Sequence, residues 1–162
     1  MKSSDAIARY LVAHNINFCF EVAGGMITHL LDSFSRCGKI NIISMHHEQA
    51  AAFAVEGVGR QTKGKEVALS MGTSGPGGTN MITGIGSCWF DSIPGLFITG
   101  QVNTDELKGK RRIRQQGFQE LDIVELVRPI TKYAKMVTDI KDVLPEIHKA
   151  VSLAMSGRKG PT

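Results

Sequence analysis

The stretch that decides the fold reads Gly72-Thr73-Ser74-Gly75-Pro76-Gly77-Gly78-Thr79-Asn80, and a short apolar run over Glu66–Met71 precedes it. Four glycines and a proline fall within its first seven residues, more than an ordinary turn between a strand and a helix needs. Glycines let the backbone approach a flat ligand closely, and amides at a helix start can bind anionic or acceptor groups. The stretch therefore predicts a ligand-binding loop over Gly72–Thr79 between a strand and a helix.

Outward from this loop, short apolar runs bounded by turn residues alternate with helical patterns. We expect strands at Asn17–Val22, Ile40–Ser44, Glu66–Met71 and Leu96–Thr99. We expect helices at Asp5–His14, Met26–Phe34, Glu48–Gln61 and Asn80–Phe90. This alternation predicts an α/β fold with a doubly wound, mostly parallel sheet flanked by helices on both faces.

After the fourth strand the pattern becomes less regular. Residues Gln101–Gly117 read as a long charged loop. A short helix at Asp122–Val127, a strand at Ile130–Val137 and an amphipathic helix at Ile140–Ser156 are expected to follow, before a basic, turn-like end at Gly157–Thr162. No internal repeat and no linker divides the 162 residues, so we expect one domain over residues 1–162.

The charge of the chain is concentrated in one place. Nineteen Lys and Arg residues face fifteen Asp and Glu residues, and five of the basic residues lie within Lys108–Arg114. A general nucleic-acid surface is therefore not indicated, and the run contains no Phe, Tyr or Trp that could stack on RNA bases. We interpret the basic run as a solvated loop or a subunit contact, and expect no nucleic-acid partner.

The chain carries no sign of export or membrane insertion. Its first residues are polar and lack the apolar core of a signal peptide. No apolar run reaches the ~18 residues that a membrane span needs. The three cysteines are odd in number and widely spaced, with no Cys-x-x-Cys pair. This pattern favours reduced thiols in a cytoplasmic protein.

The chemistry is expected at one edge of the sheet, because ligands of open parallel sheets bind beyond the carboxyl ends of the strands. The segments that follow the four strands are Ala23–Gly25, His46–Glu48, Gly72–Asn80 and Gly100–Asn103. All four should meet at the same edge. Their convergence is a better indication of a site than any one of them.

Other interpretations of these residues are weaker. Glu48 alone could simply favour the dipole of the helix that it begins. His46 and His47 are adjacent, so their side chains diverge, and no third ligand follows at a useful spacing for a metal. The segment Gly59–Glu66 has a phosphate-loop-like spacing, but Glu66 stands where Ser or Thr would bind Mg²⁺. We therefore expect no metal ligand in this chain.

Taken together, the segments resemble the N-terminal, pyrimidine-binding domain of the acetolactate synthase and pyruvate oxidase group of thiamine-diphosphate enzymes, over essentially the whole chain. Five ordered motifs carry the resemblance: His47–Ala51, Thr73–Asn80, Asp91–Pro94, Thr99–Val102 and Phe118–Glu120. Two departures are visible. Ala23 replaces the usual proline, and a longer basic link before Phe118 is more similar to synthase-like enzymes of surface-polysaccharide pathways than to the branched-chain amino-acid enzyme.

The resemblance implies a role for each site residue. Glu48 would be the catalytic acid/base that hydrogen-bonds the N1′ nitrogen of the cofactor and so activates it. The cofactor's aminopyrimidine would contact Ala23, Gly24, Thr73, Pro76, Gly77 and Asn80. The substrate side would be formed by Gln101, Phe118 and Gln119.

The resemblance also implies partners. In this family the diphosphate and Mg²⁺ bind a Gly-Asp-Gly motif in a further domain, supplied by another subunit, and the present sequence has no such motif. With the middle and diphosphate-binding domains absent, we expect half an active site for a 2-keto acid carboligase or decarboxylase, inactive alone and homo-oligomeric. There are two alternatives. The chain could be a subunit of a split decarboxylase for a sulfo- or phospho-keto acid, or a non-catalytic assembly module. FAD use stays open, because flavin contacts in this family lie mostly in other domains.

Overall fold

The computed structural model describes residues 2–162, which form a four-stranded sheet with all neighbouring strands parallel. The strands are β1 (Phe18–Glu21), β2 (Asn41–Ser44), β3 (Leu69–Gly72) and β4 (Leu96–Thr99), in the order β2-β1-β3-β4. In register, Glu21 lies opposite Ser44 on one side and Met71 on the other. The four expected strands are all present.

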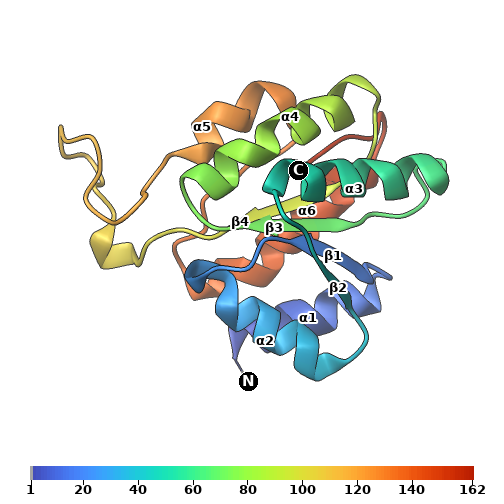
Figure 1. Ribbon diagram of the computed structural model, residues 1–162, viewed down its shortest axis with the longest axis horizontal. Coiled ribbons are helices and arrows are strands. Elements are labelled where there is room, and N and C mark those ends of the chain that lie inside the picture. Colours follow the sequence, from blue (N-terminus) through green and yellow to red (C-terminus); the bar gives the residue numbers. More distant parts are fainter. Residues whose placement is uncertain (1) are drawn as a thin grey trace.

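Helices cover both faces of the sheet (Figure 1). Helices α1 (Ser3–Ala13), α2 (Thr28–Cys37) and α6 (Val143–Met155) pack on one face around the largest apolar cluster. Helices α3 (Glu48–Gln61), α4 (Pro76–Phe90) and α5 (Ile123–Val127) cover the other face around two smaller clusters. Four 3₁₀ turns complete the order: η1 (Gly25–Ile27), η2 (Thr104–Glu106), η3 (Arg128–Ile130) and η4 (Ile140–Asp142). This arrangement confirms the doubly wound α/β fold.

Helices α3 and α4 approach each other closely because small residues lie where they cross. A β-carbon placed on Gly84 would lie 2.5 Å from the β-carbon of Ala52 and 2.9 Å from its backbone carbon. Both residues are buried. The close contact fixes the beginnings of the two helices relative to each other, and those beginnings carry the candidate site.

The expected strand at Ile130–Val137 is wrong. Its first residue ends η3, and the rest runs without strand pairing. The reason is that the free edge of β4 is paired by the last residues of the chain. Thr162 donates its amide to the Gly95 carbonyl at 2.9 Å and accepts from the Phe97 amide at 2.9 Å. At the chain's end, Gly157 and Arg158 form the expected bend, whereas Pro161 instead forms a parallel bridge with Gly95.

Helix α4 begins four residues earlier than the expected start at Asn80, so the glycine-rich loop is shorter than predicted. Gly75 has the left-handed φ of +57°, and Pro76 takes the first helical position. Proline fits there because the amide it lacks would have no helical partner. The first turn of α4 therefore consists of Pro76, Gly77, Gly78 and Thr79, and brings this backbone to the edge of the sheet.

Candidate functional site

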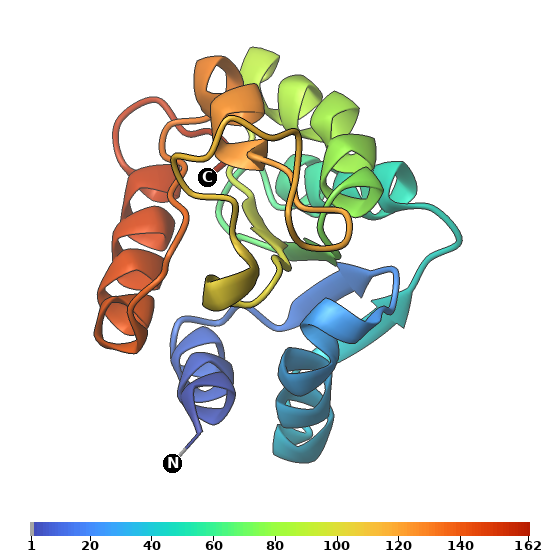
Figure 2. The same cartoon turned by 90° about the vertical axis from the view of Figure 1, so that its left-hand side faces the viewer.

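The loops that follow the four strands meet at the carboxyl edge of the sheet, which Figure 2 turns toward the reader. Two contacts join loops from different strands. A β-carbon on Gly24, after β1, would lie 2.3 Å from the γ-methyl of Thr73, after β3. A β-carbon on Gly100, after β4, would lie 2.6 Å from the β-carbon of Met26, in η1. The edge predicted from the strand order is thus one continuous surface.

Glu48 and Asn80 form the polar centre of this edge. Glu48 begins α3, where the His47 ring nitrogen Nδ1 accepts the Gln49 amide at 3.1 Å as a cap. Asn80 lies in the second turn of α4 and donates from Nδ2 to Oε2 of Glu48 at 2.8 Å. Within residues 2–162 this is the one hydrogen bond of the Glu48 carboxylate. Its other oxygen is therefore available to a ligand, and the side chain is half-buried.

Glycine residues, which expose backbone without side chains, lie beside Glu48 and Asn80. A β-carbon on Gly72 would lie 3.2 Å from the Gly77 carbonyl oxygen and 3.4 Å from Cγ of Glu48. A β-carbon on Gly77 would lie 2.7 Å from Oγ1 of Thr73. A side chain at Gly77 would collide with Thr73, and one at Gly72 would fit only tightly, so the two glycines keep a flat wall beside the carboxylate. Such a wall suits a planar ring.

The Phe118–Gln119 segment lies against the glycine-rich loop. A β-carbon on Gly75 would lie 2.9 Å from both the β-carbon and the carbonyl oxygen of Gln119. Gln119 itself has a left-handed φ of +57°, which is costly for a residue with a side chain. The neighbouring Phe118 is 75% exposed. Of the other predicted residues, Pro76 and Ala23 are also exposed at this edge.

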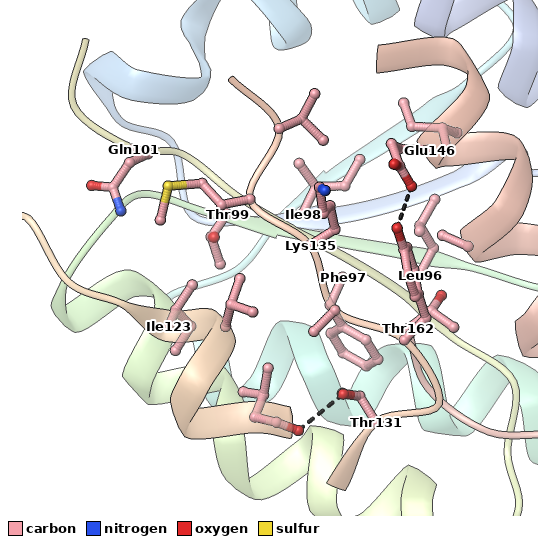
Figure 3. A pocket seen from close by; sticks show the side chains of 18 of the residues that line it. Leu96, Phe97, Ile98, Thr99, Gln101, Ile123, Thr131, Lys135, Glu146 and Thr162 are labelled. Atoms are coloured by element: carbon pink, nitrogen blue, oxygen red, sulfur yellow. Dashed lines mark hydrogen bonds between the residues drawn. The ribbon is translucent and has the colours of Figure 1, made fainter. Parts of the chain in front are cut away.

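Gln101 has a different environment. Its Nε2 donates to the Leu121 carbonyl at 2.7 Å, and its Oε1 accepts the Val102 amide at 3.0 Å. Both ends of the side-chain amide are therefore engaged by backbone groups, one of Val102 at the start of the long loop and one of Leu121 beyond its end. Gln101 also lines an apolar cavity of about 290 Å³ along β4, whose lining does not include Glu48 or Asn80. Figure 3 shows Gln101, Thr99 and Ile123 at one end of this cavity and Thr162 toward the other.

Sequence reasoning missed Glu21 at the end of the central strand β1. Its side chain is 1% exposed, and one carboxylate oxygen accepts a hydrogen bond from the Ser44 hydroxyl. The second oxygen has no partner within residues 2–162. A charged residue inside the apolar run Phe18–Val22 was the available signal. Burial, followed by the Glu21 charge, raises the pKa of the Cys19 thiol to about 12.

Together these features define a class of protein. It is an α/β domain that presents a half-buried carboxylate and a glycine wall at the carboxyl edge of a parallel sheet. Residues 2–162 contain no cluster of three His, Cys, Asp or Glu side chains suited to a metal ion. None of the helices in that range is both long and apolar enough to cross a membrane.

Comparison with known proteins identifies the family. Residues 1–126 match the model of the thiamine pyrophosphate enzyme, N-terminal TPP binding domain. The chain belongs to this family of thiamine-diphosphate enzyme domains.

Acetolactate synthases are among the relatives that it resembles over 99% of its own length. It is 35% identical to the acetolactate synthase isozyme 3 large subunit of Escherichia coli, of which it covers 27%. It is 36% identical to acetolactate synthase 2, chloroplastic, of Nicotiana tabacum, covering 23%. It is 34% identical to the probable acetolactate synthase large subunit of Methanocaldococcus jannaschii, covering 26%. The chain thus spans about a quarter of the length of these relatives.

Proposed function

We propose that this chain is the pyrimidine-binding half-site of a thiamine-diphosphate-dependent carboligase or decarboxylase that acts on 2-keto acids. The observation that carries the proposal is the Glu48 carboxylate, which Asn80 holds through one oxygen at 2.8 Å while the other oxygen has no partner within residues 2–162. This arrangement leaves a positioned acid/base beside a wall shaped for a flat ring.

The residues at this edge of the sheet have separate roles. Glu48 holds a proton at the N1′ nitrogen of the aminopyrimidine, and Asn80 fixes the orientation of its carboxylate. Gly24, Thr73 and Gly77 form the wall for the ring, with Ala23 and Pro76 at its margins. When bound, thiamine diphosphate supplies the acidic carbon that adds to a keto group and takes up the electrons released with carbon dioxide. The fit is supported by the glycine contacts, which leave no room for side chains.

The substrate side is assigned to the segment that covers the glycine-rich loop. Gln119 touches Gly75, and Phe118 projects freely beside it. Gln101 supports this side indirectly, because its amide joins the start of the long loop to Leu121. The 2-keto acid would enter between this segment and Glu48.

Completion of the site requires another subunit. The diphosphate and Mg²⁺ are assigned to a diphosphate-binding domain of a second subunit, so the chain alone should not turn over substrate. Two large apolar side chains on neighbouring helices support a subunit contact, because Phe53 on α3 is 39% exposed and Phe90 on α4 is 73% exposed. We therefore expect a homo-oligomer. The free thiols of Cys19, Cys37 and Cys88 suit a reducing, cytoplasmic location.

Calorimetric titration of thiamine diphosphate with Mg²⁺ tests the proposal. The chain is titrated alone and then mixed with a diphosphate-binding domain from the same source. Tight binding only in the mixture, together with pyruvate turnover that Glu48→Gln abolishes, is the expected result. Glu66→Gln is the control, because Glu66 is exposed and precedes β3 at the opposite edge of the sheet.

Two results would overturn the proposal. Tight binding of the cofactor to the chain alone would mean that it carries its own diphosphate site. Full turnover with Glu48→Gln in the assembled enzyme would mean that the domain serves assembly and not catalysis.

A further inference from the structure

The entire positive excess of the chain lies in one loop. The chain has 19 basic and 15 acidic residues, which gives the net charge of +4. The segment Lys108–Arg114 contains five basic residues and no acidic one. The rest of the chain therefore has 14 basic and 15 acidic residues, a net charge of −1. The attraction for anions is concentrated at this loop.

The loop has a fixed base. The carboxylate of Glu120 accepts the backbone amide of Lys108 at 2.7 Å and that of Gln116 at 2.8 Å, which holds the two ends of the loop together. Inside the loop, Nζ of Lys108 donates to the Arg114 carbonyl at 3.3 Å. The pKa of the Glu120 carboxyl is lowered, first by the hydrogen bond from the Gln116 amide. The basic side chains are thus presented from an anchored loop.

The base of this loop is part of the candidate site. Glu120 directly follows Gln119, which lies against Gly75 of the glycine-rich loop. On the other side, a β-carbon on Gly117 would lie 2.6 Å from a γ-methyl of Val102, just after β4. The loop leaves the same carboxyl edge as the other site segments and projects from it (Figures 1 and 2). Its charge therefore lies on the substrate side of the site.

None of the loop's basic side chains forms an ion pair with an acidic residue within residues 2–162, and Lys108 alone is near a carboxylate, that of Glu120. The arginines that form ion pairs there are Arg36, Arg60 and Arg128, and none belongs to the loop. Lys110, Arg112 and Arg114 are exposed, and their side chains have no hydrogen bond to residues 2–162. Arginine forks and lysine ammonium groups suit phosphate oxygens. The loop has no aromatic side chain on which a base could stack.

We propose that the loop binds a phosphate or diphosphate group carried by the keto acid or by its acceptor, so that the enzyme acts on a multiply charged small molecule. This inference rests on the proposed function for the identity of the site. It adds to the proposed function a class of substrate, anionic phosphate compounds, for which the uncharged glycine wall has no preference.

Calorimetric titration of inorganic diphosphate into the 162-residue chain, without Mg²⁺, tests the binding. The triple variant Lys110→Gln/Arg112→Gln/Arg114→Gln removes three charges without removing a hydrogen bond seen in residues 2–162. The control Arg9→Gln/Lys39→Gln/Lys65→Gln removes three exposed charges from other surfaces. We expect the loop variant to raise the Kd at least about tenfold, and the control to change it less than about twofold. Equal effects of the two variants, or no measurable binding to the parent chain, would overturn the inference.

A second measurement separates substrate from cofactor. In the assembled enzyme with saturating thiamine diphosphate and Mg²⁺, the loop variant should raise the KM for phosphonopyruvate relative to that for pyruvate, with kcat on pyruvate unchanged. Weaker binding of thiamine diphosphate instead would assign the loop to the cofactor and overturn the inference. Glu48→Gln should leave diphosphate binding to the chain intact while abolishing turnover, so the failure of one proposal can be told from the failure of the other.

Discussion

The side-chain amide of Asn80 donates to Oε2 of Glu48 at 2.8 Å and joins the first turn of α3 to the second turn of α4. The two residues are 32 positions apart in the sequence, and the contact brings them together beside the glycine wall. The close packing of α3 on α4 makes the contact possible. The two helices can approach because Gly84 has no side chain where α4 meets Ala52. The orientation of the proposed acid/base is therefore a property of the helix pair.

Asn80→Asp should lower the activity of the assembled enzyme. The substitution removes the amide donor and places a second carboxyl beside Glu48, so the Glu48 carboxylate loses the contact that orients it. Both Asn80→Asp and Asn80→Ala should lower kcat for pyruvate about tenfold or more, as loss of a hydrogen bond to a charged group does. Asn41→Asp, exposed at the amino end of β2, is the control. A kcat equal to that of the parent in both Asn80 variants would show that Asn80 does not position Glu48.

Much of the fold followed from the sequence because each parallel strand is a short, largely apolar run between turn residues. The failure at Ile130–Val137 has a physical reason. An apolar run becomes a strand only where a sheet edge is free to pair with it, and the edge of β4 pairs instead with Thr162. The late start assigned to α4 has another reason. Gly77 and Gly78 read as loop residues, but they are helical, and Thr73 and Ile123 leave little room for side chains at these positions.

The sequence was enough to predict which segments form the candidate site, but not which side chains contact each other within it. The strand order places the four loops at one edge, which is a topological consequence. The hydrogen bond between Asn80 and Glu48 depends on side-chain conformations that spacing does not specify. The burial of the Glu21 carboxyl could not be predicted, because a single charged residue near the end of an apolar run does not show how deep its side chain lies. Gln101 was assigned from a resemblance, and its engagement with Leu121 became visible only in three dimensions.

Gly84→Ala should destabilise the domain. The new methyl group would meet the backbone of Ala52, which cannot move as a flexible side chain can. We expect a loss of about 1–3 kcal/mol in the free energy of unfolding. Gly86→Ala, two residues further along α4, is the matched control. Its β-carbon would approach only Cδ1 of Ile130, at 4.0 Å, so the helix propensity of alanine should leave stability unchanged or raise it by up to about 1 kcal/mol. Urea unfolding of both variants checks the difference, and equal midpoints would contradict the packing argument.

Native alkylation should modify one of the three cysteines. Cys19 and Cys88 are fully buried, and burial raises the pKa of each thiol to about 12. At pH 8 only about one in ten thousand of these thiols would be ionised, and the thiolate is the reactive form. Cys37 is half-buried near the end of α2 and should react with iodoacetamide. Mass spectrometry should show one adduct in the native chain and three after unfolding. Rapid modification of Cys19 or Cys88 would show that the core opens readily.

The anchoring of the basic loop should weaken in acid. The pKa of Glu120 lies below its ordinary value of 4.5, because its carboxylate accepts the Gln116 and then the Lys108 amide. A carboxyl whose folded-state pKa is lowered stabilises the fold fully above its unfolded value. This contribution is lost as the pH falls below 4.5 through the lowered pKa.

The two amide protons provide the measurement. The NMR shifts of the Lys108 and Gln116 amides should titrate together, with one midpoint below 4.5, and diphosphate should bind more weakly once they have moved. Glu120→Gln should abolish the joint titration, because an amide has no charge to lose in this range. Separate midpoints for the two amides, or a midpoint at the ordinary value, would mean that the carboxylate does not hold the two ends of the loop. The charges of the loop would then lack the fixed presentation on which selection of an anionic substrate depends.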